Sequence, residues 1–143
     1  MMLIKEIAVY VNILNSRIKK RFFDDLQKNG IDVTPEQYLV LDILWDNQPL
    51  SQQKIADMIQ KDKNSVTKII DSLEKKTLVS RMVDKKDRRI NIIELTKEGR
   101  DLEKIATEVA IKFMNDTIQD IDERDLDSFV KVMRQMKNNL ERE

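Results

Sequence analysis

The hydrophobic pattern of the chain is helical almost throughout and becomes strand-like only between residues 78 and 95. Outside that segment, apolar residues recur at spacings of three and four, which places them on one face of an α-helix. Inside it, two β-prone runs flank a loop of six consecutive charged residues, 84–89. Because so much charge cannot be buried, this loop must project into solvent or onto a partner. We therefore expect a mainly α fold that contains one small β-hairpin.

Two short helices are predicted directly before the hairpin. Ser51 is placed to cap a helix over residues 52–59, and a polar turn at 60–63 leads to a second helix over about 64–76. Its apolar positions follow the i, i+3, i+4, i+7 pattern. A pair of short helices joined by a tight turn is the helix-turn-helix motif. With the hairpin as its wing, the predicted unit is a winged helix-turn-helix over residues 34–100.

Longer amphipathic helices precede this pair. The first is expected over about residues 3–29, with its apolar residues on one face. Thr34 and Gln37 then form a capping-box signal for a helix that ends near Asp46. That helix is apolar on most of its sides, which is typical of a central, buried helix.

Two further helices are predicted after the hairpin. Thr96 is placed to cap one that runs to about Ile118, and the last begins near Glu123. The helices at the two ends of the chain have no obvious partner in the helix-turn-helix unit. Packing them together, and against a second copy of the chain, would bury their apolar faces. We expect one domain over the whole chain, with residues 1–30 and 101–143 as dimerisation helices.

Composition excludes several classes of function. The chain contains no cysteine and no histidine, so it has no thiol or Ser-His nucleophile, no thiol-based sensor and no ordinary zinc site. It also has no glycine-rich loop and no paired carboxylates in a plausible cleft. We therefore expect no enzyme activity, no cofactor and no metal. No segment is apolar enough to cross a membrane, and the first residues do not resemble a signal peptide, which predicts a cytoplasmic location.

The distribution of charge is more informative than its total. The formal net charge is zero, which argues against a nucleic-acid-binding protein. Residues 54–100, however, carry 13 basic and 8 acidic side chains, whereas residues 101–143 carry 7 basic and 11 acidic ones. This asymmetry suggests a surface in the central segment that faces a polyanion. On charge alone, scattered solvated side chains remain an equal alternative.

The predicted helix over residues 64–76 has a polar outer face. If its apolar residues point inward, Asn64, Thr67, Lys68 and Asp71 share that face, with Ser65 beside them. Asn, Ser and Thr can bind base edges, the Thr methyl group can contact thymine, and Lys can reach guanine or phosphate. The alternative is the polar face that any surface helix has.

The charged loop has the composition of a DNA-contacting hairpin tip. It contains four cations, Lys85, Lys86, Arg88 and Arg89. An arginine there could enter a narrow minor groove, and lysines could neutralise phosphates. Asp87 suits such a tip only if it pairs with an arginine and fixes its direction. The alternative is a solvated turn.

The start of the first short helix is a candidate phosphate site. Ser51, Gln52 and Gln53 lie at its N-terminal end, where free N–H groups attract anions. Ordinary helix capping is the alternative, and both roles can coexist.

Motifs spread over the chain resemble the MarR (multiple antibiotic resistance regulator) family. They are Asn64-Ser65-Val66-Thr67, Leu-Glu-Lys at 73–75, Asp-Arg-Arg at 87–89 and Leu-Thr-x-x-Gly at 95–99. Their combination at these intervals is specific, and the resemblance extends over essentially the whole chain. One position departs from the pattern, because Thr77 stands where the family commonly has glycine. Threonine tolerates a positive φ angle poorly, so we expect this corner to be strained or built differently.

The resemblance implies a homodimer that binds a pseudo-palindromic site in double-stranded DNA. It implies that Asn64, Ser65, Thr67 and Lys68 read the major groove. It also implies that Arg89 enters the minor groove while Asp87 holds it. Such proteins usually repress nearby genes and release DNA when a small ligand binds.

The resemblance also implies a choice of sensing modes, of which composition excludes thiol oxidation and the usual zinc sites. The mode that the resemblance then leaves is a small aromatic or anionic effector that binds between the dimerisation helices and the helix-turn-helix unit. The first candidates to contact it are Tyr10, Arg17, Tyr38 and Trp45. The alternative, favoured for these residue types, is that they are packing residues or side chains that extend to solvent. Regulation without a ligand is also open.

Two functions compete for the whole chain. The first is a sequence-specific, double-stranded DNA-binding transcription regulator, which the basic wing tip favours. The second is a winged helix used as a protein-docking module, which would show no salt-sensitive DNA binding.

Overall fold

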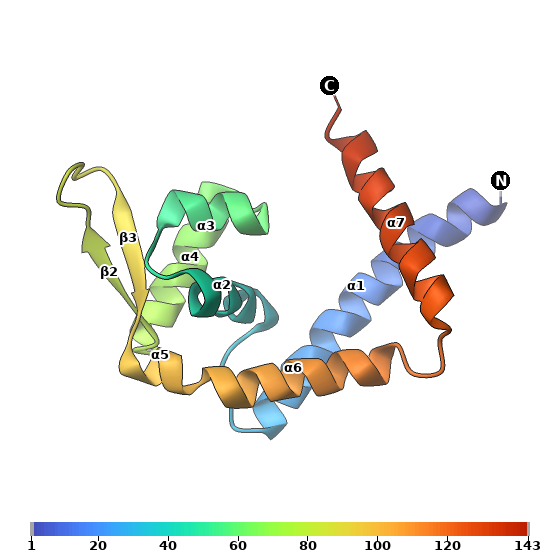
Figure 1. The fold of residues 1–143 in the computed structure, drawn as a ribbon, viewed down its shortest axis with the longest axis horizontal. Coiled ribbons are helices and arrows are strands. Elements are labelled where there is room, and N and C mark those ends of the chain that lie inside the picture. The colour runs from blue at the N-terminus through green and yellow to red at the C-terminus, as the bar shows by residue number, and fades with distance from the viewer. Residues whose placement is uncertain (1, 143) are drawn as a thin grey trace. The chain divides into compact units, whose positions relative to one another are not determined.

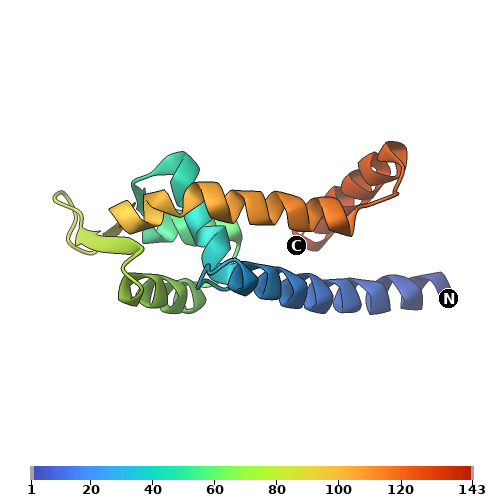
Figure 2. The ribbon, with the colours of Figure 1, turned by 90° about the horizontal axis from the view of Figure 1, so that it is seen from below.

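The structure is a computed structural model that describes residues 2–142. The chain divides after Phe113 into two compact units. The first unit holds the helices α1 to α5, a three-stranded sheet and most of α6, and the second holds α7 (Figure 1). Figure 2 shows the tip of the hairpin projecting beyond the helices of the first unit. The mainly α fold with a small β-wing, as expected from the sequence, is confirmed.

Helix α1, Met2–Lys28, is long but buries only its last turns. Phe22 and Leu26 are its buried residues, whereas the apolar residues of its first half are exposed. The chain leaves α1 through Gly30, which has a φ angle of 72°, a conformation that glycine adopts without steric cost. The exposed first half of α1 is therefore an apolar surface that the first unit leaves uncovered.

Helix α2, Pro35–Asn47, is the centre of the first unit. The predicted capping box is present, because Thr34 Oγ1 accepts from the Gln37 amide and Gln37 Oε1 accepts from the Thr34 amide, each at 3.1 Å. Helix α2 contacts α1, α3, α4 and β3 (Figure 1). The side chains that it buries are Gln37, Tyr38, Val40, Leu41 and Leu44.

The two short helices are α3, Gln52–Ile59, and α4, Lys63–Lys75. Ser51 caps α3, as expected, with its Oγ accepting from the Lys54 amide at 3.0 Å. Helix α4 begins one residue earlier than the expected start at Asn64, because Asp62 acts as its N-cap. The two helices pack on each other through side chains that include Ile55, Ala56, Val66, Ile70 and Leu73.

The wing consists of β2, Val79–Val83, and β3, Asn91–Leu95, which pair antiparallel from Val79↔Leu95 to Val83↔Asn91. A third strand, β1, Leu50–Ser51, pairs with the other edge of β3 and gives the order β1-β3-β2. Strand β1 was not expected from the sequence, because two residues carry no pattern and their partners in β3 are far along the chain.

The expected single helix after Thr96 is interrupted. Helix α5, Lys97–Asp101, ends at Leu102, and α6, Glu103–Thr117, follows. Gly99 in α5 is required by packing, since a Cβ there would overlap the carbonyl oxygen of Leu78. Trp45 Nε1 also donates to the Gly99 carbonyl oxygen at 2.9 Å, so α5 is held against both α2 and the base of the wing.

Helix α7, Glu123–Leu140, forms the second unit and is capped by Asp122. It is strongly amphipathic but has no buried residue. Its exposed apolar side chains are Phe129, Val130, Val132, Met133, Met136 and Leu140. The grouping of residues 1–30 and 101–143 as dimerisation helices stays a prediction. Within residues 2–142, no helix has the length and the apolar character of a membrane span.

Candidate nucleic-acid interface

The N-terminus of α4 is occupied by its own carboxylate cap. Asp62 accepts hydrogen bonds from the Ser65 amide at 2.8 Å and from Ser65 Oγ at 2.9 Å. The backbone and side-chain hydrogen bonds from Ser65 hold the pKa of Asp62 below its usual value. Ser65 is therefore engaged within the helix end, while Asn64 and Lys68 are exposed.

The hydroxyl group of Thr67 both donates and accepts a hydrogen bond within the protein. It donates to the Lys63 carbonyl oxygen at 2.9 Å and accepts from Gln52 Nε2 at 2.7 Å. Because the hydroxyl has one hydrogen, it has none left to donate to DNA. The contact also ties α3 to α4. Sequence reasoning missed it, since Gln52 and Thr67 are 15 residues apart and were given separate roles.

The hairpin tip holds one arginine in a fixed direction. The Asp87 carboxylate accepts from the Arg89 amide at 3.0 Å and from its Nε and Nη2 at 3.1 Å each. Asp87 was expected to suit a DNA-contacting tip only if it paired with an arginine, and its pairing with Arg89 is present. The side-chain and backbone hydrogen bonds from Arg89 lower the pKa of Asp87, and the side-chain contact raises the pKa of Arg89.

Arg89 remains available although it is paired. Its side chain is 90% exposed, so the ion pair orients the guanidinium group without covering it. Lys85, Lys86 and Arg88 are exposed beside it. An oriented and accessible guanidinium group is the kind of donor that enters a narrow minor groove.

The base of the wing is braced to α4 by Arg81. Its Nη2 lies 2.8 Å from Asp71 Oδ1, and its Nη1 donates to Glu74 Oε1 at 3.3 Å. One cation from β2 therefore offsets part of the negative charge of two carboxylates on α4. Asp71 was expected on the outer face of the helix, but its partner Arg81 was not expected. This contact could have been predicted from two acidic residues three apart on a helix, followed by an arginine on the next strand.

A groove joins three of these elements. It measures about 260 Å³ and is lined by Gln52 and Gln53 of α3, Lys63 and Val66 of α4, and Arg89 at the wing. The structure thus brings three of the proposed DNA-contacting residues, Gln52, Gln53 and Arg89, to one place. Two cations, Lys63 and Arg89, border this groove, although Lys63 was not among the expected contacts.

The corner between α4 and the wing adopts the geometry expected of glycine. Thr77 has a φ angle of 61°, in the left-handed region. Its Oγ1 donates to the Lys76 carbonyl oxygen, and its own carbonyl oxygen accepts from Thr96 Oγ1, both at 2.6 Å. The sequence left two alternatives open, a strained corner or a corner with a different backbone conformation. The structure has the strained corner.

The four candidate effector residues do not gather in one cleft. Tyr38 is 9% exposed and makes edge-to-face contacts with Phe22 and Trp45, at 5.0 and 5.8 Å between ring centroids. Burial, together with Asp42, raises the pKa of Tyr38. Tyr10 and Arg17 are exposed on α1. These positions favour the packing role for Tyr38 and Trp45.

A cleft of about 310 Å³ lies between α1 and α6, but none of the four candidates lines it. Its lining residues are Arg21, Asp25, Asn29, Ile105, Glu108, Val109 and Lys112.

Known proteins share this arrangement of a winged helix-turn-helix. The model of the MarR family matches residues 33–90. The HTH-type transcriptional regulator SarZ of Staphylococcus epidermidis is 26% identical over 112 residues, which is 78% of this chain and 74% of its own length. The HTH-type transcriptional repressor MdtR of Bacillus subtilis is 33% identical over 97 residues, 68% of this chain and 61% of its own.

Solved structures agree with these sequence matches. The crystal structure of the S. aureus MepR-DNA complex has a TM-score of 0.86 over 92% of this chain and 96% of that one. At 24% identity, it shows the same fold. Residues 33–90 of the chain therefore carry the winged helix-turn-helix of the MarR family. Its named relatives are transcription regulators, so the expectation that it is not an enzyme is confirmed.

Proposed function

We propose that this protein is a sequence-specific transcription regulator that binds double-stranded DNA as a homodimer. The observation that carries the proposal is the groove in which the start of α3, the start of α4 and Arg89 of the wing meet. These are the parts that a winged helix-turn-helix presents to a duplex. The DNA-bound state named for MepR supports the assignment.

In this mechanism α4 is the reading helix and lies in the major groove. Asn64 and Lys68 are exposed near its start and reach base edges or phosphates. Arg89, directed by Asp87, enters the adjacent minor groove, where the negative potential is strongest. The lysines of the wing and the start of α3 contact phosphates, which position the protein but do not select a sequence.

A homodimer follows from the apolar surfaces that the chain leaves uncovered. No residue of α7 is buried, although the helix has a continuous apolar stripe. The first half of α1 is equally exposed. A second copy that covers such faces would also supply a second reading helix for the other half of a pseudo-palindromic site.

We propose that the protein represses the transcription of the genes that it regulates. We also propose that it is cytoplasmic. The repressor name of MdtR supports repression. Relief by a small aromatic or anionic effector is part of the proposal, with the exposed Tyr10 and Arg17 as its remaining contacts.

The test begins with selection of bound sequences from random duplex DNA. We expect a pseudo-palindromic site whose affinity falls steeply as salt rises. Lys68→Ala should weaken binding at particular bases and Arg89→Ala should weaken it overall, each by about five- to a hundredfold. Lys20→Ala, which removes an exposed lysine of α1, is the control for lost charge. Unchanged affinity in both variants would remove the proposed contacts, and the absence of salt-sensitive DNA binding would favour a protein-docking module instead.

A further inference from the structure

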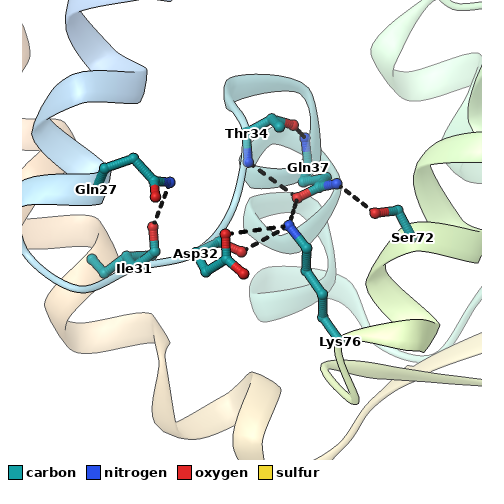
Figure 3. A network of polar contacts seen from close by, with 7 residues as sticks. All are labelled: Gln27, Ile31, Asp32, Thr34, Gln37, Ser72 and Lys76. Atoms are coloured by element: carbon teal, nitrogen blue, oxygen red, sulfur yellow. Dashed lines mark hydrogen bonds and ion pairs between the residues drawn. The ribbon is translucent and has the colours of Figure 1, made fainter.

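Gln37 has a role beyond the capping box. It is 7% exposed, and among residues 2–142 it is the one polar side chain buried to the level of the hydrophobic core. Its Oε1 accepts from the Thr34 amide at 3.1 Å, and its Nε2 donates to Ser72 Oγ on α4 at 2.9 Å (Figure 3). The amide group therefore bonds both to the start of its own helix and to the reading helix.

Lys76, the C-cap residue of α4, completes the contact. Its Nζ donates to Gln37 Oε1 and to the Asp32 carbonyl oxygen, each at 2.9 Å, and lies 3.8 Å from the Asp32 carboxylate. Asp32 belongs to the segment between α1 and α2. The end of α4 is thus bonded to α2 and to this segment at once (Figure 3).

The same segment is bonded to α1. Gln27 Nε2 donates to the Ile31 carbonyl oxygen at 3.2 Å (Figure 3). Residues 31–32 are therefore hydrogen-bonded on one side to the last turn of α1 and on the other to Lys76 at the C-terminal end of α4. Ile31 and Val33, which flank Asp32, are 2% and 1% exposed, so this segment is fixed by packing as well.

Ser72 and Lys76 lie in one row along α4 with the exposed residues near its start. Asn64, Lys68, Ser72 and Lys76 are spaced four apart, and such residues are neighbours on a helix surface. Ser72 lies about 12 Å from Asn64 along the axis. Because a helix moves as a rigid rod, a small tilt where Ser72 is held displaces Asn64 and Lys68 relative to DNA.

We propose that Gln37, acting through Ser72 and Lys76, is a positioning residue that fixes the reading helix relative to the α1–α2 segment. It thereby sets the affinity for the selected DNA site. The proposal rests on the proposed DNA-binding function. A buried amide with three hydrogen bonds adds little net free energy, because it exchanges water for protein partners, but it specifies one geometry. Its effect should therefore appear in sequence-specific binding more than in folding.

The test compares three variants of the full-length protein with the wild type. Ser72→Ala removes one contact and leaves the capping box intact. Gln37→Met keeps the approximate size of the side chain and removes all its hydrogen bonds. Gln37→Glu keeps the acceptor roles toward Thr34 and Lys76, and the Ser72 hydroxyl can turn to donate to it. Lys75→Met, at the exposed neighbour of Lys76, is the matched control.

Affinity is measured for the DNA site selected by the wild type and for an unrelated duplex of equal length. We expect Ser72→Ala and Gln37→Met to bind the selected site about five- to thirtyfold more weakly. Binding to the unrelated duplex should stay the same, and Gln37→Glu should match the wild type. Equal losses on both duplexes, or no loss on either, would overturn the proposal.

Amide hydrogen exchange in the free protein gives a second result that does not depend on DNA. We expect faster exchange at the C-terminal half of α4 in Gln37→Met and wild-type exchange in Gln37→Glu. Unchanged exchange in Gln37→Met would overturn the anchoring. If the wild-type protein selects no sequence, the DNA-binding function is refuted instead. The exchange measurement does not use DNA, so it shows separately whether Gln37 anchors α4.

Discussion

At the scale of single residues, hydrogen bonds inside the protein limit what each side chain can offer to DNA. The Thr67 hydroxyl is bonded to Gln52 and to the Lys63 carbonyl oxygen, so its methyl group is the part left to make a new contact. In the major groove, a methyl group is complementary to the C5-methyl group of thymine. Thr67 should therefore favour thymine through packing.

This role predicts opposite results for two conservative substitutions. Thr67→Ser keeps the hydroxyl and should lose the preference for thymine at one position of the selected site, by about fourfold, the value of one buried methyl group. Thr67→Val keeps the methyl group and should retain the preference. Competitive binding with thymine and uracil at each position of the site measures both. A preference that survives in the serine variant and disappears in the valine variant would contradict it.

Thr77 is the residue at which backbone strain can be relieved. A left-handed φ angle costs an L-residue about 1–2 kcal/mol, whereas glycine in a folded segment costs about 0.5–1 kcal/mol of entropy. Thr77→Gly should therefore stabilise the protein by up to about 1 kcal/mol, measured by denaturant unfolding. Both substitutions lose the hydroxyl bond to Lys76, so Thr77→Ala, which keeps the Cβ atom at a left-handed φ angle, should be less stable than Thr77→Gly. An alanine variant as stable as the glycine variant would exclude strain as the cause.

At the scale of secondary-structure elements, local sequence signals determine where helices begin. Contacts between residues distant in the sequence determine features such as strand β1. Ser51, Thr34 and Thr96 were predicted as caps, and each accepts the expected hydrogen bond. Asp87 and Arg89 are two residues apart, so their pairing could also be anticipated. Strand β1 and the break at Leu102 could not, because they depend on residues distant in the sequence or on a local change of backbone direction.

The candidate site shows the same division. Periodicity indicates which face a residue occupies but not which partner it meets, so Arg81 with Asp71, Gln52 with Thr67, and Gln37 with Ser72 were all missed.

The N-cap of α4 predicts a pH dependence. The folded-state pKa of Asp62 is lowered from its usual 3.8 by the hydrogen bonds from Ser65. The stability that it contributes is therefore present above pH 3.8 and is lost as the pH falls through the lower, folded-state pKa. Asn caps a helix about as well as Asp and does not titrate.

Thermal unfolding of Asp62→Asn and the wild type should therefore give similar Tm values at pH 7. Below pH 3.8 the wild type should lose stability relative to the variant. Asp62→Ala, which removes the cap, should have the lower Tm at pH 7. Parallel Tm curves for the wild type and Asp62→Asn down to pH 2 would show that the cap is not ionised in the way described.

At the scale of the whole molecule, the exposed stripe of α7 predicts an effect on assembly. Met133 is 48% exposed and lies between Phe129 and Met136 on the apolar face. Met133→Glu should shift the protein from dimer to monomer in sedimentation velocity, and it should weaken DNA binding because two half-sites are no longer engaged together. Gln135→Glu places the same charge next to Met136 on the same helix and should change neither result. A Met133→Glu protein that remains dimeric would remove α7 from the interface.

The brace between Arg81 and α4 has a consequence for solubility. In the order β1-β3-β2, strand β2 is terminal, so one side of its backbone has no partner strand. Its sequence is β-branched and apolar apart from Ser80 and Arg81, and Met82 and Val83 are 47% and 55% exposed. Strands of this kind are templates for aggregation, and an inward charge is a common safeguard against it. Because Arg81 is held by Asp71 and Glu74, the charge at the centre of this terminal strand is fixed against α4, and a strand that paired with β2 would meet it.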